Sequence, residues 1–297
     1  RVAGCDFDIG VFTNFSEDHI SEKEHESMDD YFKSKEKLFA MCKKGYANVD
    51  EFKTTALIKD SQNCEFKTYG IDNECDLLAK DVTITNVSVD YKVKLGSKNE
   101  RIRVSIPGRF SVYNILAAIS VCLDMGASVE AIKETMENIA VPGRSELVIH
   151  NAEYPVMIDY AHTPESLASI LEAVKTYTRG KVICVFGCGG DRDHSKRPLM
   201  GEVAGKIADF SIVTTDNPRT EKPEEIIKEI EAGIEKTKGK YKVIVDRREA
   251  IKEAIEMAQK DDIVIIAGKG HENYQILGKV KHHFDDKEIA HEFLNNK

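Results

Sequence analysis

Residues 181–193 read KVICVFGCGGDRD, and this stretch decides the fold class. Five consecutive apolar residues, three of them β-branched, predict a buried strand. Glycines and charged residues follow at once, which is typical of a loop at the carboxyl end of a parallel strand. The segment therefore predicts an α/β domain that carries a ligand site at one edge of its sheet.

The rest of the second half repeats this pattern. Apolar strands alternate with longer amphipathic helices, which predicts a Rossmann-like, doubly wound parallel sheet. The strands are predicted at 155–159, 181–186, 210–214, 242–245, 263–267 and 276–280. The helices are predicted at 164–178, 198–208, 223–236, 247–259 and 286–295.

The first half of the chain is less regular, and we expect a mixed sheet with helices. A strand is predicted at 11–14, and helices are predicted at 28–42, 111–123 and 128–138. Between residues 54 and 106, short alternating segments separated by turn residues predict antiparallel strands, the first of them TTALI at 54–58. The change of pattern near residue 146 predicts two domains, 1–146 and 147–297.

Composition and charge exclude several classes of protein. The chain has 297 residues, of which 41% are hydrophobic and 31% charged, and this is typical of a globular protein. The formal net charge of −9 argues against nucleic acid as a partner. No apolar run reaches the roughly 18–20 residues that span a bilayer, so we expect no membrane association and a cytoplasmic location.

Polar loops follow four of the predicted strands. Because the carboxyl ends of parallel strands meet at one edge of a sheet, we expect these loops to form a single rim. Their mixture of cationic and anionic side chains suits a zwitterionic ligand or a nucleotide. Helix caps and tight turns would by themselves explain about half of these residues. The loops are 159–164, 187–193, 216–219 and 268–272.

Ordered motifs along the whole chain carry a resemblance to a known family. They are TN-x-x-x-DH at 13–19, YFKSKEKLF at 31–39, GRFSVYNILAA at 108–118, PGRSE at 142–146, DYAHTP at 159–164, GCGGDRD at 187–193, KRPLMG at 196–201, DNPR at 216–219, GKGHE at 268–272 and FDDKEIA at 284–290. In this order they resemble the Mur ligases, most closely those that add the third amino acid of the peptidoglycan stem peptide.

The resemblance implies the later part of a central ATPase domain, followed by a C-terminal domain for the incoming amino acid. The phosphate-loop motif G-x-x-x-x-G-K-[ST] is absent from the sequence. Relative to the family, we therefore expect the chain to begin after the phosphate loop. We also expect this chain alone neither to hydrolyse ATP nor to form an amide bond.

The implied activity is ATP-dependent amide-bond formation, through an acyl phosphate, between UDP-N-acetylmuramoyl-L-alanyl-D-glutamate and meso-2,6-diaminopimelate. ATP and Mg²⁺ are the implied cofactors. By resemblance, His19 and a carbamylated Lys35 would hold the metal, and Arg1 would contact the UDP-linked substrate. The residues implied for ATP are Asn114, Arg144, Asp159 and His162. Those implied for the amino acid are Arg192, Asp216, Asn217, Pro218, Arg219, Gly268 and Glu272.

Arg219 decides the expected amino acid. Diaminopimelate has a second carboxylate that lysine lacks, and an arginine binds a carboxylate through charge-assisted, often bidentate hydrogen bonds. Lysine-adding relatives tend to carry a neutral residue there. Three alternatives stay open: an L-lysine-adding ligase, another ligase that shares this module (a cyanophycin or folylpolyglutamate synthetase), and a non-catalytic amino-acid-binding module.

Overall fold

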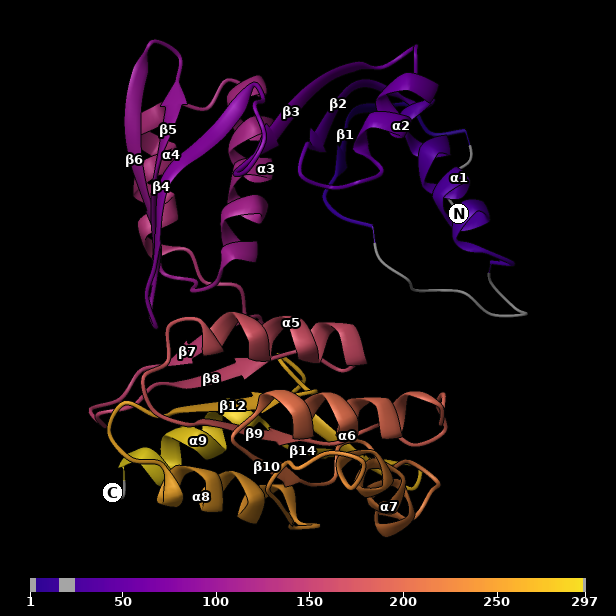
Figure 1. The fold of residues 1–297 in the computed structure, drawn as a ribbon, viewed down its shortest axis with the longest axis vertical. Coiled ribbons are helices and arrows are strands. Elements are labelled where there is room, and N and C mark those ends of the chain that lie inside the picture. The colour runs from indigo at the N-terminus through magenta and orange to yellow at the C-terminus, as the bar shows by residue number, and fades with distance from the viewer. Residues whose placement is uncertain (1–3, 16–24, 296–297) are drawn as a thin grey trace. The chain divides into compact units, whose positions relative to one another are not determined.

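The computed structural model describes residues 4–15 and 25–295 (Figure 1). The chain divides into two compact units. Unit 1 comprises residues 1–84, 89–105 and 109–139, and unit 2 comprises residues 85–88, 106–108 and 140–297. The domain boundary near residue 146 stays a prediction. In the described residues, no helix is both long and apolar enough to cross a membrane.

Unit 1 is built on a six-stranded sheet of order β1-β2-β3-β4-β5-β6. The first four strands run parallel, and β4, β5 and β6 form an antiparallel meander. The strands are β1 (Phe7–Phe12), β2 (Cys42–Asn48), β3 (Glu65–Gly70), β4 (Leu77–Ile84), β5 (Val89–Leu95) and β6 (Lys98–Val104). The helices are α1 (Met28–Phe39), α2 (Thr54–Asp60), α3 (Arg109–Asp124) and α4 (Val129–Asn138).

Two expectations for unit 1 were wrong. Residues 54–58, predicted as a strand, begin α2, because the Thr54 hydroxyl donates to the backbone oxygen of Asn48 and Leu57 is buried in the core. Strand β3, predicted to lie in an antiparallel series, pairs parallel to both β2 and β4. The helix α2 returns the chain to the same end of the sheet, which parallel pairing with β2 requires. Strand β2 itself was not predicted, because Lys43, Lys44 and Gly45 interrupt its apolar pattern.

Unit 2 contains a second six-stranded sheet, of order β11-β10-β9-β12-β8-β7. Its strands are parallel except β7, which pairs antiparallel to β8 at one edge. The α/β fold class predicted from the sequence is confirmed. The strands are β7 (Glu146–Val148), β8 (Val156–Asp159), β9 (Val182–Phe186), β10 (Phe210–Val213), β11 (Tyr241–Val243) and β12 (Ile263–Ala267).

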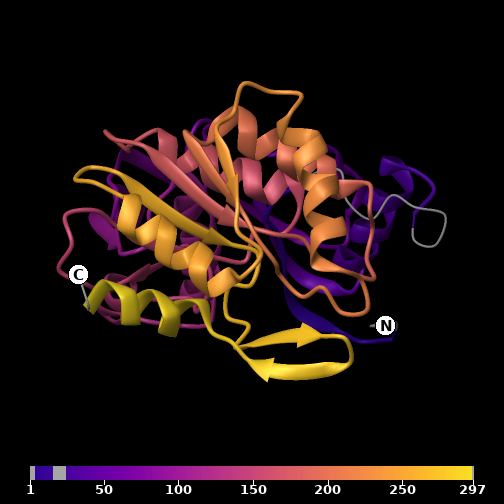
Figure 2. The same cartoon turned by 90° about the horizontal axis from the view of Figure 1, so that it is seen from below.

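Helices cover both faces of this sheet. Figures 1 and 2 show α5, α6 and α7 on one side and α8 and α9 on the other. Every residue of β9 and β12 is buried, which explains their uninterrupted apolar sequences. The helices are α5 (Pro164–Lys175), α6 (Lys196–Ile207), α7 (Pro223–Ile234), α8 (Arg247–Met257) and α9 (Asp286–Asn295).

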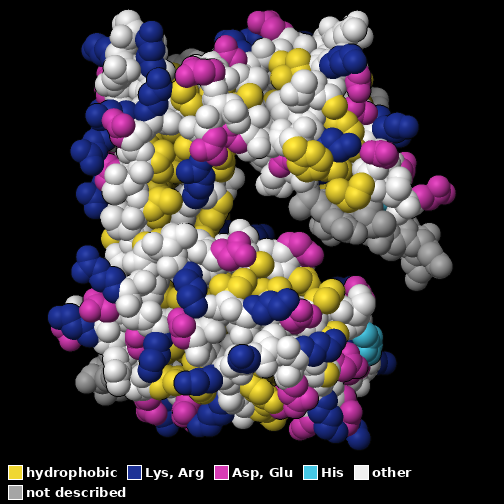
Figure 3. All heavy atoms as spheres, viewed as in Figure 1, with side chains coloured by type: hydrophobic (Ala, Val, Ile, Leu, Met, Phe, Trp, Pro, Cys, Tyr) yellow, Lys and Arg dark blue, Asp and Glu magenta, His cyan; other side chains and the backbone are white. Residues whose placement is uncertain are grey.

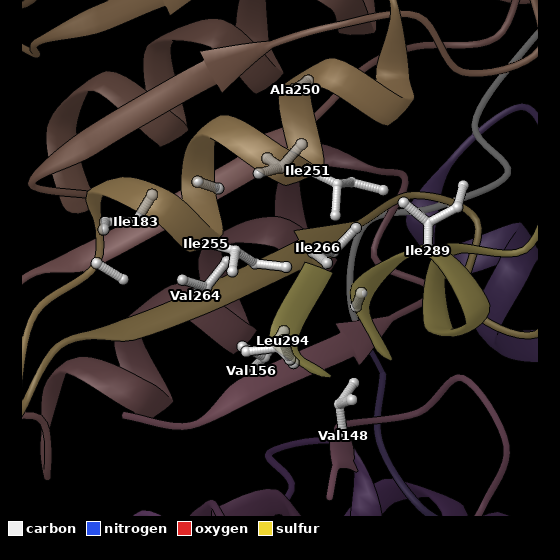
Figure 4. Packing of buried hydrophobic residues seen from close by; sticks show 14 of the residues in the cluster. Val148, Val156, Ile183, Ala250, Ile251, Ile255, Val264, Ile266, Ile289 and Leu294 are labelled. Atoms are coloured by element: carbon white, nitrogen blue, oxygen red, sulfur yellow. The ribbon is translucent and has the colours of Figure 1, made fainter. Parts of the chain in front are cut away.

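The core beneath α8 and α9 is aliphatic. Figure 4 shows Ile251 and Ile255 of α8 in the same cluster as Val264 and Ile266 of β12, with Ile289 of α9 completing it. Outside this core, acidic and basic side chains are interspersed on the face of unit 2 that Figure 3 shows. The core holds the strand ends in place, so the loops that follow them start from fixed positions.

The final predicted strand, 276–280, was wrong. The chain instead forms a hairpin of β13 (Tyr274–Leu277) and β14 (Val280–His283), which is separate from the six-stranded sheet (Figure 2). The hairpin turns at Gly278, whose φ is +62°. A glycine adopts this left-handed conformation without steric strain, and for this reason the predicted strand breaks at its centre.

Candidate functional site

The loops after β9 and β10 bring two of the predicted arginines together. A Cβ atom built on Gly189 would lie 2.9 Å from Nη1 of Arg219 and 3.7 Å from Cγ of Arg192. Both arginine side chains therefore pass over the same glycine, Arg219 half-buried and Arg192 exposed. The Arg219 guanidinium and the Cγ of Arg192 thus lie beside the same glycine, and arginine side chains at such a place can bind a carboxylate.

Arg219 is held by its backbone as well as by its side chain. Its Nη1 donates to the backbone oxygen of Gly190 at 2.7 Å. Its backbone nitrogen donates to the oxygen of Ile276 at 3.1 Å, and its oxygen accepts from the nitrogen of Gly278 at 2.7 Å. These hairpin contacts hold Arg219 at a φ of +51°, which a residue other than glycine rarely adopts.

The carboxylates of Asp216 and Glu272 each contact a residue of the neighbouring loop, Asp216 meeting Gly268 and Glu272 meeting Asn217. Nδ2 of Asn217 donates to Oε2 of Glu272 at 2.9 Å. A Cβ atom on Gly268 would lie 2.8 Å from Oδ2 of Asp216, so only a glycine leaves that carboxylate room. Asp216 and Asn217 are buried, and Glu272 is half-buried. This group can accept hydrogen bonds from an ammonium.

Lys269, predicted as a cation of the rim, lies below the site. Its side chain is fully buried, and Nζ lies 3.5 Å from Oε2 of Glu272 and 3.4 Å from Oδ1 of Asn217. Burial lowers the pKa of the Lys269 ammonium, and the nearby carboxylate of Asp216 opposes that shift. Lys269 thus contacts Glu272 and Asn217 from inside the protein, and its buried ammonium is not accessible to a ligand.

A second cluster surrounds Tyr160, directly after β8. The Arg144 guanidinium carbon lies 4.5 Å from the Tyr160 ring centroid, and the rings of His162 and His271 lie at 4.7 and 5.4 Å. Asp159 accepts from the backbone nitrogen of Ser145 at 2.7 Å, and burial raises the pKa of its carboxyl. The structure therefore groups Arg144, Asp159 and His162, and adds Tyr160 and His271, which sequence reasoning missed.

The remaining predicted residues belong to unit 1 or lie outside the described residues. Lys35 is half-buried on α1, with Nζ 4.6 Å from the centroid of the Tyr31 ring. Asn114 is exposed on α3. Arg1 and His19 lie outside the described residues.

Two family models account for most of the sequence. Residues 1–122 match the Mur ligase middle domain, and residues 143–270 match the glutamate ligase domain of Mur ligases. The chain belongs to the Mur ligase family. The resemblance inferred from the motifs is thus confirmed, including the order of the two domains.

Curated relatives and a solved structure agree with this assignment. The chain is 51% identical over 295 residues to a UDP-N-acetylmuramoyl-L-alanyl-D-glutamate–2,6-diaminopimelate ligase of Caldanaerobacter subterraneus subsp. tengcongensis, and 46% identical over 299 residues to the ligase of that name from Clostridioides difficile. Each match covers 99% of this chain and 61% of the relative. A solved structure of such a ligase superposes with a TM-score of 0.67 at 35% identity, covering 99% of this chain and 61% of that chain. The chain thus spans about three fifths of these relatives.

Two ion pairs of this Mur ligase chain, each made by a fully buried arginine, were missed at the sequence level. Arg247 on α8 is bonded to Asp286 on α9 at 2.7 and 2.8 Å, and both side chains are fully buried. Nη2 of Arg247 also donates to the oxygen of Ala267 at 3.0 Å, at the end of β12. The second pair joins Arg197 to Glu221. Asp286 lies in the FDDKEIA motif, and Arg197 lies in KRPLMG, but neither motif identifies the partner.

The Arg197–Glu221 pair predicts an acid-sensitive contribution to stability. The hydrogen bonds that Arg197 donates to Glu221 lower the pKa of the Glu221 carboxyl from 4.5 to about 2. Because the folded pKa is depressed, the contribution is complete above about pH 4.5 and is lost as the pH falls towards 2. As the pH falls from 4.5 towards 2, we expect the free energy of unfolding to decrease less in Glu221→Gln than in the unsubstituted chain. Urea unfolding at several pH values measures both. Equal losses in the two proteins would contradict this prediction.

Proposed function

We propose that this chain is part of an ATP-dependent ligase that joins meso-2,6-diaminopimelate to UDP-N-acetylmuramoyl-L-alanyl-D-glutamate during synthesis of peptidoglycan precursors. The names of the relatives support this activity. The observation that carries the choice of amino acid is the convergence of Arg192 and Arg219 over Gly189. Because these substrates include nucleotides, we propose a cytoplasmic location.

The site offers cationic side chains for a carboxylate of the amino acid and acceptor groups for one of its ammonium groups. In the proposal, Arg219 and Arg192 bind carboxylate, while Asp216, Asn217 and Glu272 orient an ammonium, with Pro218 and Gly268 shaping the space between them. The amino group at the other end of diaminopimelate stays free to react. Lysine would leave a guanidinium of the site without its carboxylate partner, and a site built for such a bond rejects a ligand that lacks it.

The cluster around Tyr160 is the proposed nucleotide contact of unit 2. Arg144 carries a positive charge that suits a phosphate, Asp159 can accept a hydrogen bond from a ribose hydroxyl, and the rings of Tyr160 and His162 offer stacking surfaces. Asn114 is the proposed contact from unit 1. ATP would transfer its γ-phosphate to the D-glutamate carboxylate, and the amino group of diaminopimelate would displace that phosphate to form the amide.

Magnesium is a further part of the proposal, with His19 and Lys35 as the residues that would hold it and Arg1 as a contact to the UDP-linked substrate. Within the described residues, no group of three or more His, Cys, Asp or Glu side chains is arranged to hold a metal ion. An unmodified Lys35 ammonium would repel a cation, whereas carbamylation of its Nζ would supply anionic oxygens. When bound, Mg²⁺ offsets the charge of the triphosphate.

Calorimetric titration of the chain with meso-diaminopimelate and with L-lysine tests the proposed specificity. We expect saturable binding of diaminopimelate, weakened about 10- to 100-fold by Arg219→Ala because a charge-assisted hydrogen bond is lost. Arg179→Ala is the control, since Arg179 is exposed and precedes β9 at the opposite edge of the sheet. Lysine binding as tight as that of diaminopimelate, or no binding of either by the folded chain, would contradict the proposal.

A further inference from the structure

We infer that the Arg197–Glu221 ion pair is a clamp that sets the distance between the two loops carrying Arg192 and Arg219, and that Glu221 is thereby a positioning residue for the amino-acid carboxylate. The ligand in this inference rests on the proposed function. The clamp itself is defined by contacts within unit 2.

Arg197 is a buried residue that is bonded to both loops, 187–193 and 216–221. It lies at the start of α6 and its side chain is fully buried. Its Nη1 and Nη2 donate to the two carboxylate oxygens of Glu221 at 2.9 and 2.8 Å, which is a bidentate pair. Nη2 also lies 3.3 Å from the backbone oxygen of Gly189, the glycine over which both arginines pass. One guanidinium therefore contacts both loops.

Glu221 connects the loops from the other side. It follows the DNPR segment by two residues, and its backbone nitrogen donates to the oxygen of Pro218 at 3.1 Å. Its Oε1 accepts from the backbone nitrogen of Asp191 at 2.5 Å, immediately before Arg192. The carboxylate thus receives hydrogen bonds from α6 and from the Arg192 loop at once, while its own backbone belongs to the Arg219 segment.

Other bonds between the loops keep the same spacing. The nitrogen of Gly190 donates to the oxygen of Asn217 at 2.9 Å, and Oγ1 of Thr220 donates to Oδ1 of Asp191 at 2.7 Å. A binding constellation keeps its affinity only if its groups stay within about 0.5 Å of their working geometry. A spacing fixed on this scale matters most for a ligand whose carboxylate must meet both arginines.

Glu229 provides a matched comparison. It lies on α7, and its Oε2 accepts from Nη1 of Arg197 at 3.1 Å. Among the described contacts, its other partner is His194, so it adds a negative charge beside Arg197 without bonding to 187–193 or 216–221. Glu221→Gln and Glu229→Gln each remove one charge next to the same buried guanidinium, but only Glu221 is also bonded to the loop that carries Arg192.

Glutamine cannot replace Glu221 in this geometry. One carboxylate oxygen accepts from both Asp191 and Arg197, and the other accepts from Arg197. If the amide oxygen takes the first position, the amide NH₂ meets the donor Nη1 at the second, and the reverse orientation leaves the Asp191 nitrogen unpaired. The clamp loses a bond in either orientation.

Diaminopimelate titration of the two variants, with amide hydrogen exchange of residues 187–193 and 216–221, tests the clamp. We expect Glu221→Gln to bind about tenfold more weakly and to exchange faster in both loops, and Glu229→Gln to stay within about twofold of the unsubstituted chain. Similar affinity and exchange in the two variants would overturn the inference.

Two further results separate the inference from the proposed function. If the unsubstituted chain does not bind diaminopimelate, the proposed function fails, and with it the positioning role of Glu221. The exchange data still decide whether the clamp exists.

If Glu221→Gln does not fold, Thr220→Val replaces it, since Thr220 is exposed and its hydroxyl joins the same loops. Weaker diaminopimelate binding by Thr220→Val supports the inference, and unchanged binding overturns it.

Discussion

Asp286→Ala is expected to lower the free energy of unfolding by about 3–5 kcal/mol, the cost of leaving a buried charge without its partner. Asp286 and Arg247 are both fully buried and bonded at 2.7 and 2.8 Å. Without the carboxylate, the Arg247 guanidinium would remain in the core with only the backbone oxygens of Ala267 and Thr215 as partners from the described contacts. Urea unfolding followed by circular dichroism measures the loss.

Glu292→Ala is the control for this prediction. Glu292 lies on the same helix, α9, and is bonded to Arg248, the residue next to Arg247, but both side chains are partly exposed to solvent. An exposed ion pair contributes about 0–1 kcal/mol, so this variant should unfold almost as the unsubstituted chain does. If the two variants lost similar amounts of stability, the buried pair would not have the importance assigned to it.

Gly190→Ala is expected to cost about 3 kcal/mol of stability, at the upper end for overpacking, and to abolish binding of diaminopimelate. A Cβ atom on Gly190 would lie 1.9 Å from the backbone oxygen of Pro218 and 2.7 Å from its carbonyl carbon. A backbone carbonyl cannot rotate away as a side chain can, so the DNPR segment would have to move. Arg219 directly follows Pro218, so it would move as well, and the bond from its Nη1 to the oxygen of Gly190 would be disturbed.

The neighbouring glycine separates the effect on stability from the effect on binding. A Cβ atom on Gly189 would first meet Nη1 of Arg219, at 2.9 Å, which is the far end of a flexible side chain. Gly189→Ala should therefore keep the stability within about 1 kcal/mol and still weaken diaminopimelate binding, measured by the same two methods. Equal destabilisation by the two substitutions would show that the close approach at Gly190 does not control the DNPR segment.

The sequence predicted the sheet of unit 2 well because its signal is local. Continuous apolar runs at β9 and β12 require a strand that is buried on both faces, and polar loops after such strands must share one edge. Unit 1 was predicted less well. TTALI is rich in β-branched residues, yet it forms a helix there, because the Thr54 hydroxyl bond and the burial of Leu57 outweigh the β propensity.

The sequence by itself determined the α/β class, the membership of the Mur ligase family and the residue types at the strand ends. The tertiary structure alone decided which of these charged side chains are buried and which stay accessible at the strand ends. Lys269 and Arg219 both read as rim cations, but Lys269 is buried against Glu272, while Arg219 is turned over Gly189 by its bonds to the hairpin. The physical reason is that the burial and pairing of a side chain depend on partners distant in the chain, such as Glu221 for Arg197. The residues next to a charged side chain do not identify such a partner.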